Sequence, residues 1–250
     1  MNYLLITKRY YAEWLGVNPK LLDQDGMFHF SYSQNRDVVQ LGYNKQLDLY
    51  AYLSDETKII TYGRDLEQSA DWIQSAFENN NDLEELKVSI HNRFGRNLQH
   101  DYKYYFSKLP SDIDYSKANQ LTLKDYPAYL HFFKAQYPDS EPETWLADYY
   151  KEIAEKGYAF GFYVGDELVS VSDAPDMPYM KDSVVEIGMN TLPAYRNKGY
   201  GKIVLGSMLK FIVNIPKVPI VSCTSTNVAS QNLIESVGFI RLADVITLSL

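Results

Sequence analysis

The sequence predicts an α+β protein in two parts, and three observations lead to this prediction. The chain has 250 residues, enough for one large domain or two small ones. Hydrophobic residues make up 46% of it and charged residues 22%, as in ordinary soluble globular proteins. From residue 119 onward, apolar strands and amphipathic helices follow in the order β-α-α-β-β-β-α-β-α-β-β. We therefore expect a smaller α/β domain at residues 1–115 and an α+β domain at residues 116–250.

The first part contains predicted strands, then helices, then one more strand. Residues 26–62 alternate apolar and polar side chains in segments separated by turn residues, which is typical of β-structure. Residues 65–78 place apolar side chains at helical spacing. Asp82 is a suitable N-cap for a second helix, and residues 101–107 could form a strand. The polar, proline-containing segment that follows places the domain boundary near residue 115.

The second part has clearer boundaries. Gly165, Asp166 and Glu167 form a hairpin signal between two strands, and Gly238 is a suitable glycine just after the last helix. The predicted strands are residues 120–123, 157–164, 168–172, 183–191 and 219–223, with one or two more from residue 240 onward. The predicted helices are residues 125–136, 141–156, 199–213 and 227–237.

Composition excludes several classes of protein. No stretch approaches the roughly 18 apolar residues that span a bilayer, and the N-terminus lacks the pattern of a secretory signal. Cys223 is the single cysteine, so an internal disulfide and a cysteine-cluster zinc site are impossible. The four histidines include no pair at helical metal-ligand spacing. We therefore expect a cytoplasmic protein that holds no metal and does not associate with a membrane.

The charge is unevenly distributed. The net charge of −8 argues against a nucleic-acid partner, because such proteins usually present a basic face. Residues 187–234 contain no Asp or Glu but five basic residues, so the rest of the chain carries −13. A polyanionic ligand would therefore bind within this acid-free window. Tyrosine is also abundant, at 22 residues, which indicates either a compositional bias or an aromatic-lined pocket.

The acid-free window contains a candidate phosphate-binding turn at residues 193–202. A predicted strand leads into this turn and a helix leads out of it, which is the context that an oxyanion site needs. Gly199 and Gly201 lack side chains, so backbone N–H groups can approach an anion. Three side chains add full positive charges: Arg196, Lys198 and Lys202. Alternatively, this is an ordinary strand–helix turn that happens to contain Asn-Lys-Gly.

A second motif follows the turn. The turn reads Arg196-x-x-Gly199-x-Gly201, and a later helix carries the pattern Asn227, Ser230, Leu233, Gly238 and Phe239. At this spacing the two motifs resemble those of the GNAT superfamily of acetyl-CoA-dependent N-acetyltransferases. The resemblance covers about half of the chain and implies a mixed, mostly antiparallel central sheet flanked by helices. The two-part organisation is also similar to bacterial acetyltransferases of the zwittermicin-resistance type.

The resemblance implies a site for acetyl-CoA as co-substrate. The diphosphate would bind backbone N–H groups of residues 197–202, and the pantetheine arm would pair with residues 189–191. The thioester would lie where the strands at 183–191 and 219–223 separate. The implied cofactor-binding residues are Met189, Asn190, Thr191, Arg196, Asn197, Lys198, Gly199, Tyr200, Gly201, Lys202 and Asn227. Asn227 could equally be a simple N-cap, and the two roles are compatible.

Acetyl transfer to an amine needs a general base, because an ammonium is protonated at neutral pH. Glu186 is the candidate, since it lies in an apolar strand where burial would make its carboxylate a stronger base. Members of the family often use a Glu on this strand. Alternatively, Glu186 faces solvent or pairs with a lysine. The position where many members carry a tyrosine acid is Ile234 here, so another hydroxyl serves or the thiolate leaves unaided.

The resemblance and the charge lead to a hypothesis with two alternatives. We expect an N-acetyltransferase acting on a primary amine of a small molecule, such as an amino acid, a polyamine or an antibiotic-like compound. The alternatives are a protein or peptide N-acetyltransferase and a non-catalytic acyl-CoA-binding module. Residues 1–115 would cover the acceptor side or represent a degenerate GNAT-like half. The nearest glycine turn there, at residues 93–96, lacks the second glycine, so we expect one coenzyme A site per chain, in a monomer or homodimer.

Overall fold

A computed structural model describes residues 1–41, 44–80, 82–175 and 177–250. In chain order, the strands of this part are β1 (Met27–Tyr32), β2 (Leu49–Leu53), β3 (Thr57–Tyr62), β4 (Gln99–Phe106), β5 (Asn119–Gln120), β6 (Ala159–Val164), β7 (Glu167–Asp173), β8 (Val184–Glu186), β9 (Gly188–Thr191), β10 (Val218–Thr224) and β11 (Phe239–Leu248). They form two sheets. The large sheet has the order β1-β3-β2-β11-β4-β10-β8, and the small sheet has the order β5-β6-β7-β9.

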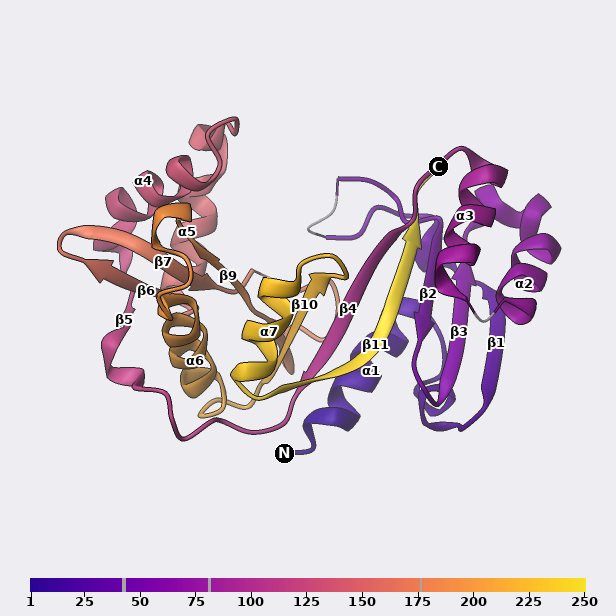
Figure 1. The fold of residues 1–250 in the computed structure, drawn as a ribbon, viewed down its shortest axis with the longest axis horizontal. Helices are drawn as coiled ribbons and strands as arrows, with labels where there is room; N and C mark the ends of the chain where they lie inside the picture. Colours follow the sequence, from indigo (N-terminus) through magenta and orange to yellow (C-terminus); the bar gives the residue numbers. More distant parts are fainter. Residues whose placement is uncertain (42–43, 81, 176) are drawn as a thin grey trace.

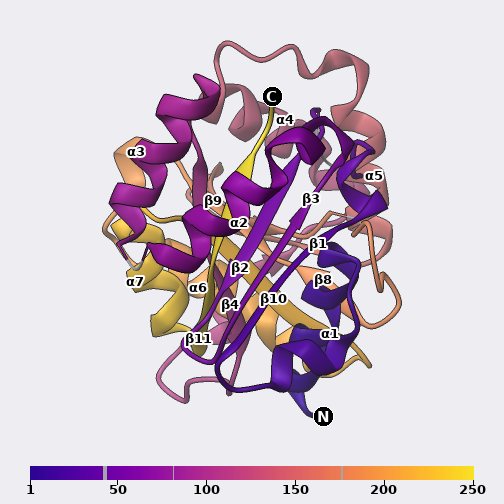
Figure 2. The ribbon, with the colours of Figure 1, turned by 90° about the vertical axis from the view of Figure 1, so that its right-hand side faces the viewer.

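Helices cover both sheets (Figure 1). They are α1 (Tyr3–Leu15), α2 (Ala70–Asn79), α3 (Leu83–Phe94), α4 (Tyr126–Gln136), α5 (Leu146–Glu155), α6 (Tyr200–Ile212) and α7 (Val228–Ser236). Helix α1 lies on one face of the large sheet, and α2, α3 and α7 lie on the other (Figure 2). Most strand pairs are antiparallel, while β1 with β3 and β8 with β10 are parallel. This arrangement confirms the predicted mixed, mostly antiparallel α+β fold.

The last strand of the chain lies inside the sheet of the first part. Strand β11 pairs antiparallel with β2 along one edge and with β4 along the other. A register shift between Arg241 and Ala243 bends it where it passes from α7 toward the N-terminal strands. Strand β4 also pairs with β10, so strands from before and after residue 115 alternate in one sheet (Figure 1). The domain boundary near residue 115 stays a prediction. Strands from before and after this boundary pair with one another in the large sheet.

The strand predicted at residues 183–191 is divided between the two sheets. Strand β8 pairs with β10 in the large sheet, whereas β9 pairs with β7 in the small sheet. The single residue between them, Ile187, donates its N–H to the carbonyl of Ile220. The two sheets therefore separate immediately after Glu186. A cleft between diverging strands is where the resemblance expects the thioester.

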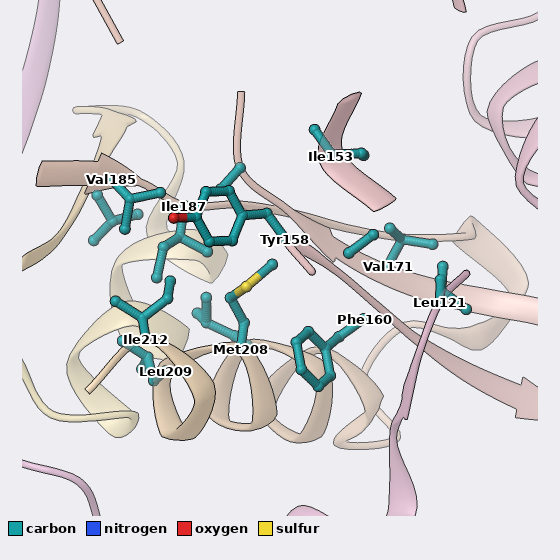
Figure 3. Packing of buried hydrophobic residues seen from close by; sticks show 14 of the residues in the cluster. Leu121, Ile153, Tyr158, Phe160, Val171, Val185, Ile187, Met208, Leu209 and Ile212 are labelled. Atoms are coloured by element: carbon teal, nitrogen blue, oxygen red, sulfur yellow. The ribbon is translucent and has the colours of Figure 1, made fainter. Parts of the chain in front are cut away.

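Side chains alternate across this divided strand. Val185 and Ile187 point toward α6, where they pack with Met208 and Leu209 in the largest apolar cluster (Figure 3). Since successive side chains in a strand point to opposite faces, Glu186 between them points away from α6. Its face is covered by α1, whose apolar side chains form a second cluster with strands β8 and β10. Helices of both parts thus enclose the point where the sheets separate.

The other predicted elements agree with the structure within a few residues. One difference is the helix predicted at residues 65–78, which starts as a 3₁₀ helix over Arg64–Ser69 before α2 begins. Asp82 caps α3 as expected, since its side chain accepts from the N–H groups of Glu84 and Glu85. The predicted strand at 120–123 is only the two residues of β5. None of the described helices is long and apolar enough to cross a membrane.

Candidate active site

The turn before α6 has the backbone conformation of an anion cradle. A 3₁₀ turn at Pro193–Tyr195 leads into it, and α6 starts at Tyr200. Asn197 and Gly199 have positive φ angles of 60° and 83°. At Gly199 an added Cβ would meet no atom within 4 Å, so the backbone there borders open space. The first N–H groups of a helix have no intrahelical acceptor, and the positive end of the α6 dipole lies at this turn.

A cavity of about 430 Å³ lies beside this turn, between β9, α6 and α7. Its walls bring together the predicted cofactor residues from three separate segments of the chain. They are Met189, Asn190, Thr191, Arg196, Asn197, Gly199, Tyr200, Gly201, Lys202 and Asn227. Lys198 does not line the cavity, and its Nζ lies 4.9 Å from the ring centre of Tyr195 instead. The volume falls within the range of small-molecule sites.

The glycine at position 201 sets how closely α6 approaches its neighbours. A Cβ added there would lie 3.2 Å from the side chain of Leu233 and 3.3 Å from that of Met189. Both distances are tighter than ordinary contacts, so a larger residue would push α6 away from β9 and α7. Gly199 allows the positive φ angle of the turn, whereas Gly201 allows α6 to pack closely against β9 and α7. The two glycines of the motif thus have different physical roles.

Basic side chains at the turn are held by neighbouring oxygens. The Nε of Arg196 donates to the carbonyl of Thr191 at 3.1 Å, which ties the turn to the end of β9. The Nζ of Lys202 lies 2.8 Å from the carboxylate of Asp112. This hydrogen bond lowers the pKa of Asp112 below its ordinary value. Lys202 therefore carries its charge at the cavity wall, partly neutralised by a carboxylate from the segment before β5.

Asn227 acts as the N-cap of α7. Its side-chain oxygen accepts a hydrogen bond from the N–H of Ser230 at 3.1 Å. Asn227 also lines the cavity, so the capping role leaves it in reach of a bound molecule. The structure therefore accommodates both roles considered for this residue. Its side-chain amide N–H₂ group is not needed for the cap.

Glu186 lies at the end of β8, partly buried under α1. The hydroxyl of Ser222 on β10 donates to its Oε1 at 2.7 Å. Burial, and then the nearby Glu186, raise the pKa of Tyr11 on α1 well above its ordinary value. Glu186 thus neither faces open solvent nor forms an ion pair with a lysine, in the part of the chain that the structure describes. Helix α1 of the first part forms one wall of its surroundings.

Ile234, the residue at the position of the usual tyrosine acid, is buried in α7 with 4% of its surface exposed. It packs in the apolar cluster and offers no proton donor. Cys223 on β10 is partly buried, and its Sγ lies 4.0 Å from the hydroxyl of Tyr104. Burial raises the pKa of the Cys223 thiol. This supports a packing role for the cysteine rather than a nucleophilic one.

Sequence reasoning missed Asp173 at the end of β7. Its Oδ2 accepts a hydrogen bond from the hydroxyl of Tyr129 at 2.7 Å, and the hydroxyl of Tyr149 also donates to this carboxylate. Burial raises the pKa of Asp173 above its ordinary value. In the sequence, Asp173 is simply a polar residue just after a predicted strand. Its pairing with Gly188 on β9 is what places it near the site.

A second cavity, of about 640 Å³, lies between the two parts of the chain. Its walls come from the β2–β3 turn, α2, α3, β4 and β11. Within it, Arg241 lies 3.5 Å from the ring centre of Tyr102 and 2.6 Å from the carboxylate of Asp244. The same carboxylate lies 2.5 Å from Nε2 of His100. No local sequence pattern indicated this cluster, because its residues meet only through the pairing of β4 with β11.

Comparisons with known proteins agree with this geometry. A family model described as an acetyltransferase (GNAT) domain matches residues 110–240. A GNAT-family acetyltransferase from Colwellia psychrerythraea is similar in structure, with 19% identity, a TM-score of 0.53 and 84% of each chain covered. A putative GNAT acetyltransferase from Novosphingobium aromaticivorans shares 20% identity at a TM-score of 0.48. That match covers 60% of this chain and 63% of the other, which is less than two thirds of that protein.

An aminoglycoside N-acetyltransferase solved in complex with CoA is also similar, with 21% identity and a TM-score of 0.42. That match covers 50% of this chain and 88% of the other. No curated protein matches the chain. The match to the family model identifies an acyltransferase domain. Because the family model covers more than half of the chain, this protein belongs to the GNAT acetyltransferase family.

Proposed function

We propose that this protein transfers the acetyl group of acetyl-CoA to a primary amine of a small molecule. The observation that carries the proposal is the cavity between β9, α6 and α7, which contains the glycine turn and its free N–H groups. In this proposal the diphosphate binds the N–H groups of residues 197–202, and the pantetheine arm extends β9 along residues 189–191. Arg196 and Lys202 add positive charge, and Asn227 contacts the arm.

The thioester would then lie at the gap between β9 and β10. Glu186 borders this gap on the face opposite α6, and its hydrogen bond to Ser222 fixes the carboxylate. We infer direct transfer: Glu186 first takes a proton from the ammonium, and the neutral nitrogen then bonds to the acetyl carbon as the carbon–sulfur bond breaks. The second proton of the nitrogen passes to the coenzyme A thiolate, which gives the amide and free coenzyme A. Coenzyme A leaves as a thiolate without a dedicated acid, since Ile234 cannot donate a proton.

The charge distribution supports a cationic acceptor. Outside residues 187–234 the chain carries −13, so the field around the acceptor side attracts cations. Aminoglycosides, polyamines and amino-acid amines all meet this condition.

A thermal melt with and without acetyl-CoA tests the cofactor site. Ligand at about 100 times its dissociation constant adds roughly 2.7 kcal/mol to the folded state, so the melting temperature should rise. Gly199→Glu should abolish the shift, because the new carboxylate enters the anion cradle. Gly95→Glu is the matched control, since Gly95 also has a positive φ and open space around it but lies at the end of α3. An unchanged shift in Gly199→Glu would remove the turn from the proposal.

Glu186→Gln tests the base. We expect turnover to fall by about 10²-fold or more, because the amine loses its proton acceptor, with acetyl-CoA affinity unchanged. Steady-state acetyl transfer and calorimetry of acetyl-CoA binding measure the two quantities. Ser222→Ala should have a smaller effect, since it removes only the group that orients the carboxylate. Full turnover in Glu186→Gln would exclude Glu186 as the base.

A further inference from the structure

Asp173 lies on the same face of the sheets as the candidate base. It pairs with Gly188 across β7 and β9, and Gly188 follows Glu186 by two residues. Residues two apart in a strand share a face, and directly paired residues do so as well. Ile187 and Met189, on either side of Gly188, both pack toward α6, so the alternation of side chains continues from β8 into β9. Two carboxylates, those of Glu186 and Asp173, therefore lie beside the point where the two sheets separate.

Glycine at position 188 lets the carboxylate of Asp173 reach over β9. A Cβ added at Gly188 would lie 3.3 Å from Oδ1 of Asp173, so a side chain there would press against this oxygen. Oδ2 is held by the hydroxyl of Tyr129 on α4. The carboxylate is thus held by Tyr129 on the helix side, and its other oxygen lies close to the backbone at the start of β9. In the proposed function, the acetyl group lies next to these first residues of β9.

Asp173 has no basic partner within the part of the chain that the structure describes. Its hydrogen bonds come from two tyrosine hydroxyls, and among the described residues no lysine, arginine or histidine forms an ion pair with it. Two neutral donors leave part of the hydrogen-bonding capacity of a carboxylate unused. A partly buried charge without a counter-ion is costly. An external cation that reached Asp173 would relieve this cost and complete its hydrogen bonds.

Aromatic rings surround the approach to Asp173. Tyr149 donates to it, and its ring centre lies 6.0 Å from that of Trp145, which is 44% exposed. The ring of Phe133 lies 5.3 Å from Trp145 and 4.9 Å from Tyr137. These four side chains of α4, α5 and the segment between them form the aromatic cluster. Aromatic faces attract organic cations, so the cluster and the carboxylate favour the same kind of ligand.

The aromatic cluster also reaches the proposed path of the pantetheine arm. The hydroxyl of Tyr137 lies near the side chain of Asn190 on β9, which lowers the pKa of Tyr137 while burial, the larger effect, raises it. Asn190 lines the cofactor cavity, so one edge of the cluster borders that cavity.

We propose that Asp173 and the aromatic cluster bind a second ammonium group of the acceptor, so the preferred substrates are organic diamines and polyamines. This inference rests on the proposed function, in which the reacting amine meets the acetyl group beside Glu186. One carboxylate receives the reacting amine and the other holds the distal cation. Asp173 is then a specificity-determining residue that takes no part in proton transfer.

Acetyl transfer from acetyl-CoA to 1,4-diaminobutane and to n-butylamine tests this inference. The two amines share a four-carbon chain and differ in the distal ammonium. We expect wild-type kcat/KM to favour the diamine by about 10-fold or more, the effect of one charge-assisted hydrogen bond. Asp173→Asn should raise KM for the diamine by a similar factor and leave kcat/KM for n-butylamine unchanged. The monoamine thus also reports whether the variant is folded.

Two further variants control the experiment. Tyr129→Phe keeps the carboxylate and removes one of its donors, so it should weaken the diamine preference only partly. Asp37→Asn removes a matched pair in the first part, where the hydroxyl of Tyr32 donates to Asp37 at 2.5 Å. It should change neither substrate, because that pair lies at the end of β1.

Three outcomes overturn the inference. Equal loss with both amines in Asp173→Asn would place Asp173 at the reacting nitrogen or in the structure. Equal kcat/KM for the two amines in the wild type would exclude a second cation site. If neither amine is acetylated, calorimetry of 1,4-diaminobutane with the CoA-loaded protein decides, and no binding overturns the inference. Failure of acetyl-CoA itself to bind would instead contradict the proposed function.

Discussion

The two sheets differ in how locally they are built. The small sheet comes from strands between residues 119 and 191, and consecutive strands β5, β6 and β7 are neighbours. The large sheet combines strands from both ends of the chain, with β11 between β2 and β4. A family model recognises residues 110–240, which contain the whole small sheet but end at the start of β11. A segment that recurs as a family is therefore not the same as a segment that folds independently.

The difference also applies to the site. The cofactor cavity is built from β9, α6 and α7, all inside the family segment. The surroundings of Glu186, in contrast, include α1 from the first part of the chain. We infer that binding of the acyl donor depends on the family segment, whereas the acceptor side depends on both parts. The three predictions below test this contrast between the family segment and the structure that both parts of the chain build together.

The largest expected effect is on residues 1–115 expressed alone. Without β11, the strands β2 and β4 lose their shared partner, and the apolar side chains of Val245 and Ile246 leave two clusters. We expect this fragment to be unfolded, while the full chain melts in one transition. Circular dichroism across a temperature ramp measures both. A cooperative melt of the fragment would instead support an independent domain that ends near residue 115.

An intermediate effect is expected for Asp244→Asn in the second cavity. Burial opposes ionisation of Asp244, but hydrogen bonds from His100 and Arg241 outweigh it and hold its pKa below the ordinary value. This stabilisation is present above the unfolded pKa of about 3.9 and is lost as pH falls through the folded pKa. We expect the variant to lose about 2 kcal/mol of unfolding free energy at pH 7.

Urea unfolding at several pH values checks this prediction. The difference between wild type and Asp244→Asn should shrink below about pH 4, where the unfolded wild type takes up a proton at Asp244 before the folded wild type does. His100 and Asp244 connect β4 to β11, so the measurement reports on the pairing that joins the two parts. A difference that stays constant down to pH 3 would mean that the carboxylate charge is not its source.

The smallest effect is expected for Asp112→Asn. Asp112 lies just inside the family segment and pairs with Lys202 at the cofactor turn. The pair is exposed, so its loss should leave the melting temperature unchanged. The freed Lys202 would attract the coenzyme A phosphates more strongly, and we expect the dissociation constant to fall by about 2- to 3-fold. Calorimetry at low and high salt measures this, and the gain should vanish at high salt.

Local patterns predicted most elements of this fold but not their pairing. The helix α6 follows from apolar spacing and the turn before it, and α7 follows from its cap Asn227 and from Gly238. The alternation of apolar and polar residues in β11 does not show that it pairs with β2, because the sequence of one strand does not identify its partner in a sheet. The same limit explains the strand at residues 183–191, which looks continuous until its two ends join different sheets.

The site divides in the same way. The candidate cofactor turn is contiguous in sequence, and its two glycines mark it, so local patterns suffice to predict it. Glu186 is predicted because a carboxylate in an apolar strand is unusual. Asp173 was missed because its position and surroundings depend on Gly188 on another strand and on tyrosines on two helices. Acceptor-side residues are gathered by tertiary contacts and therefore cannot be read in order along the chain.

The place of β11 also affects how the protein is made. Translation proceeds at about 5–20 residues per second, so roughly 10–40 s separate the synthesis of β2 from that of β11. During this time the edges of β2 and β4 that β11 will join have no permanent partner, and open strand edges pair readily with other chains. These two edges therefore stay without their partner until β11 has left the ribosome. A chaperone that covers the unpaired edges of β2 and β4 would therefore raise the yield of folded enzyme.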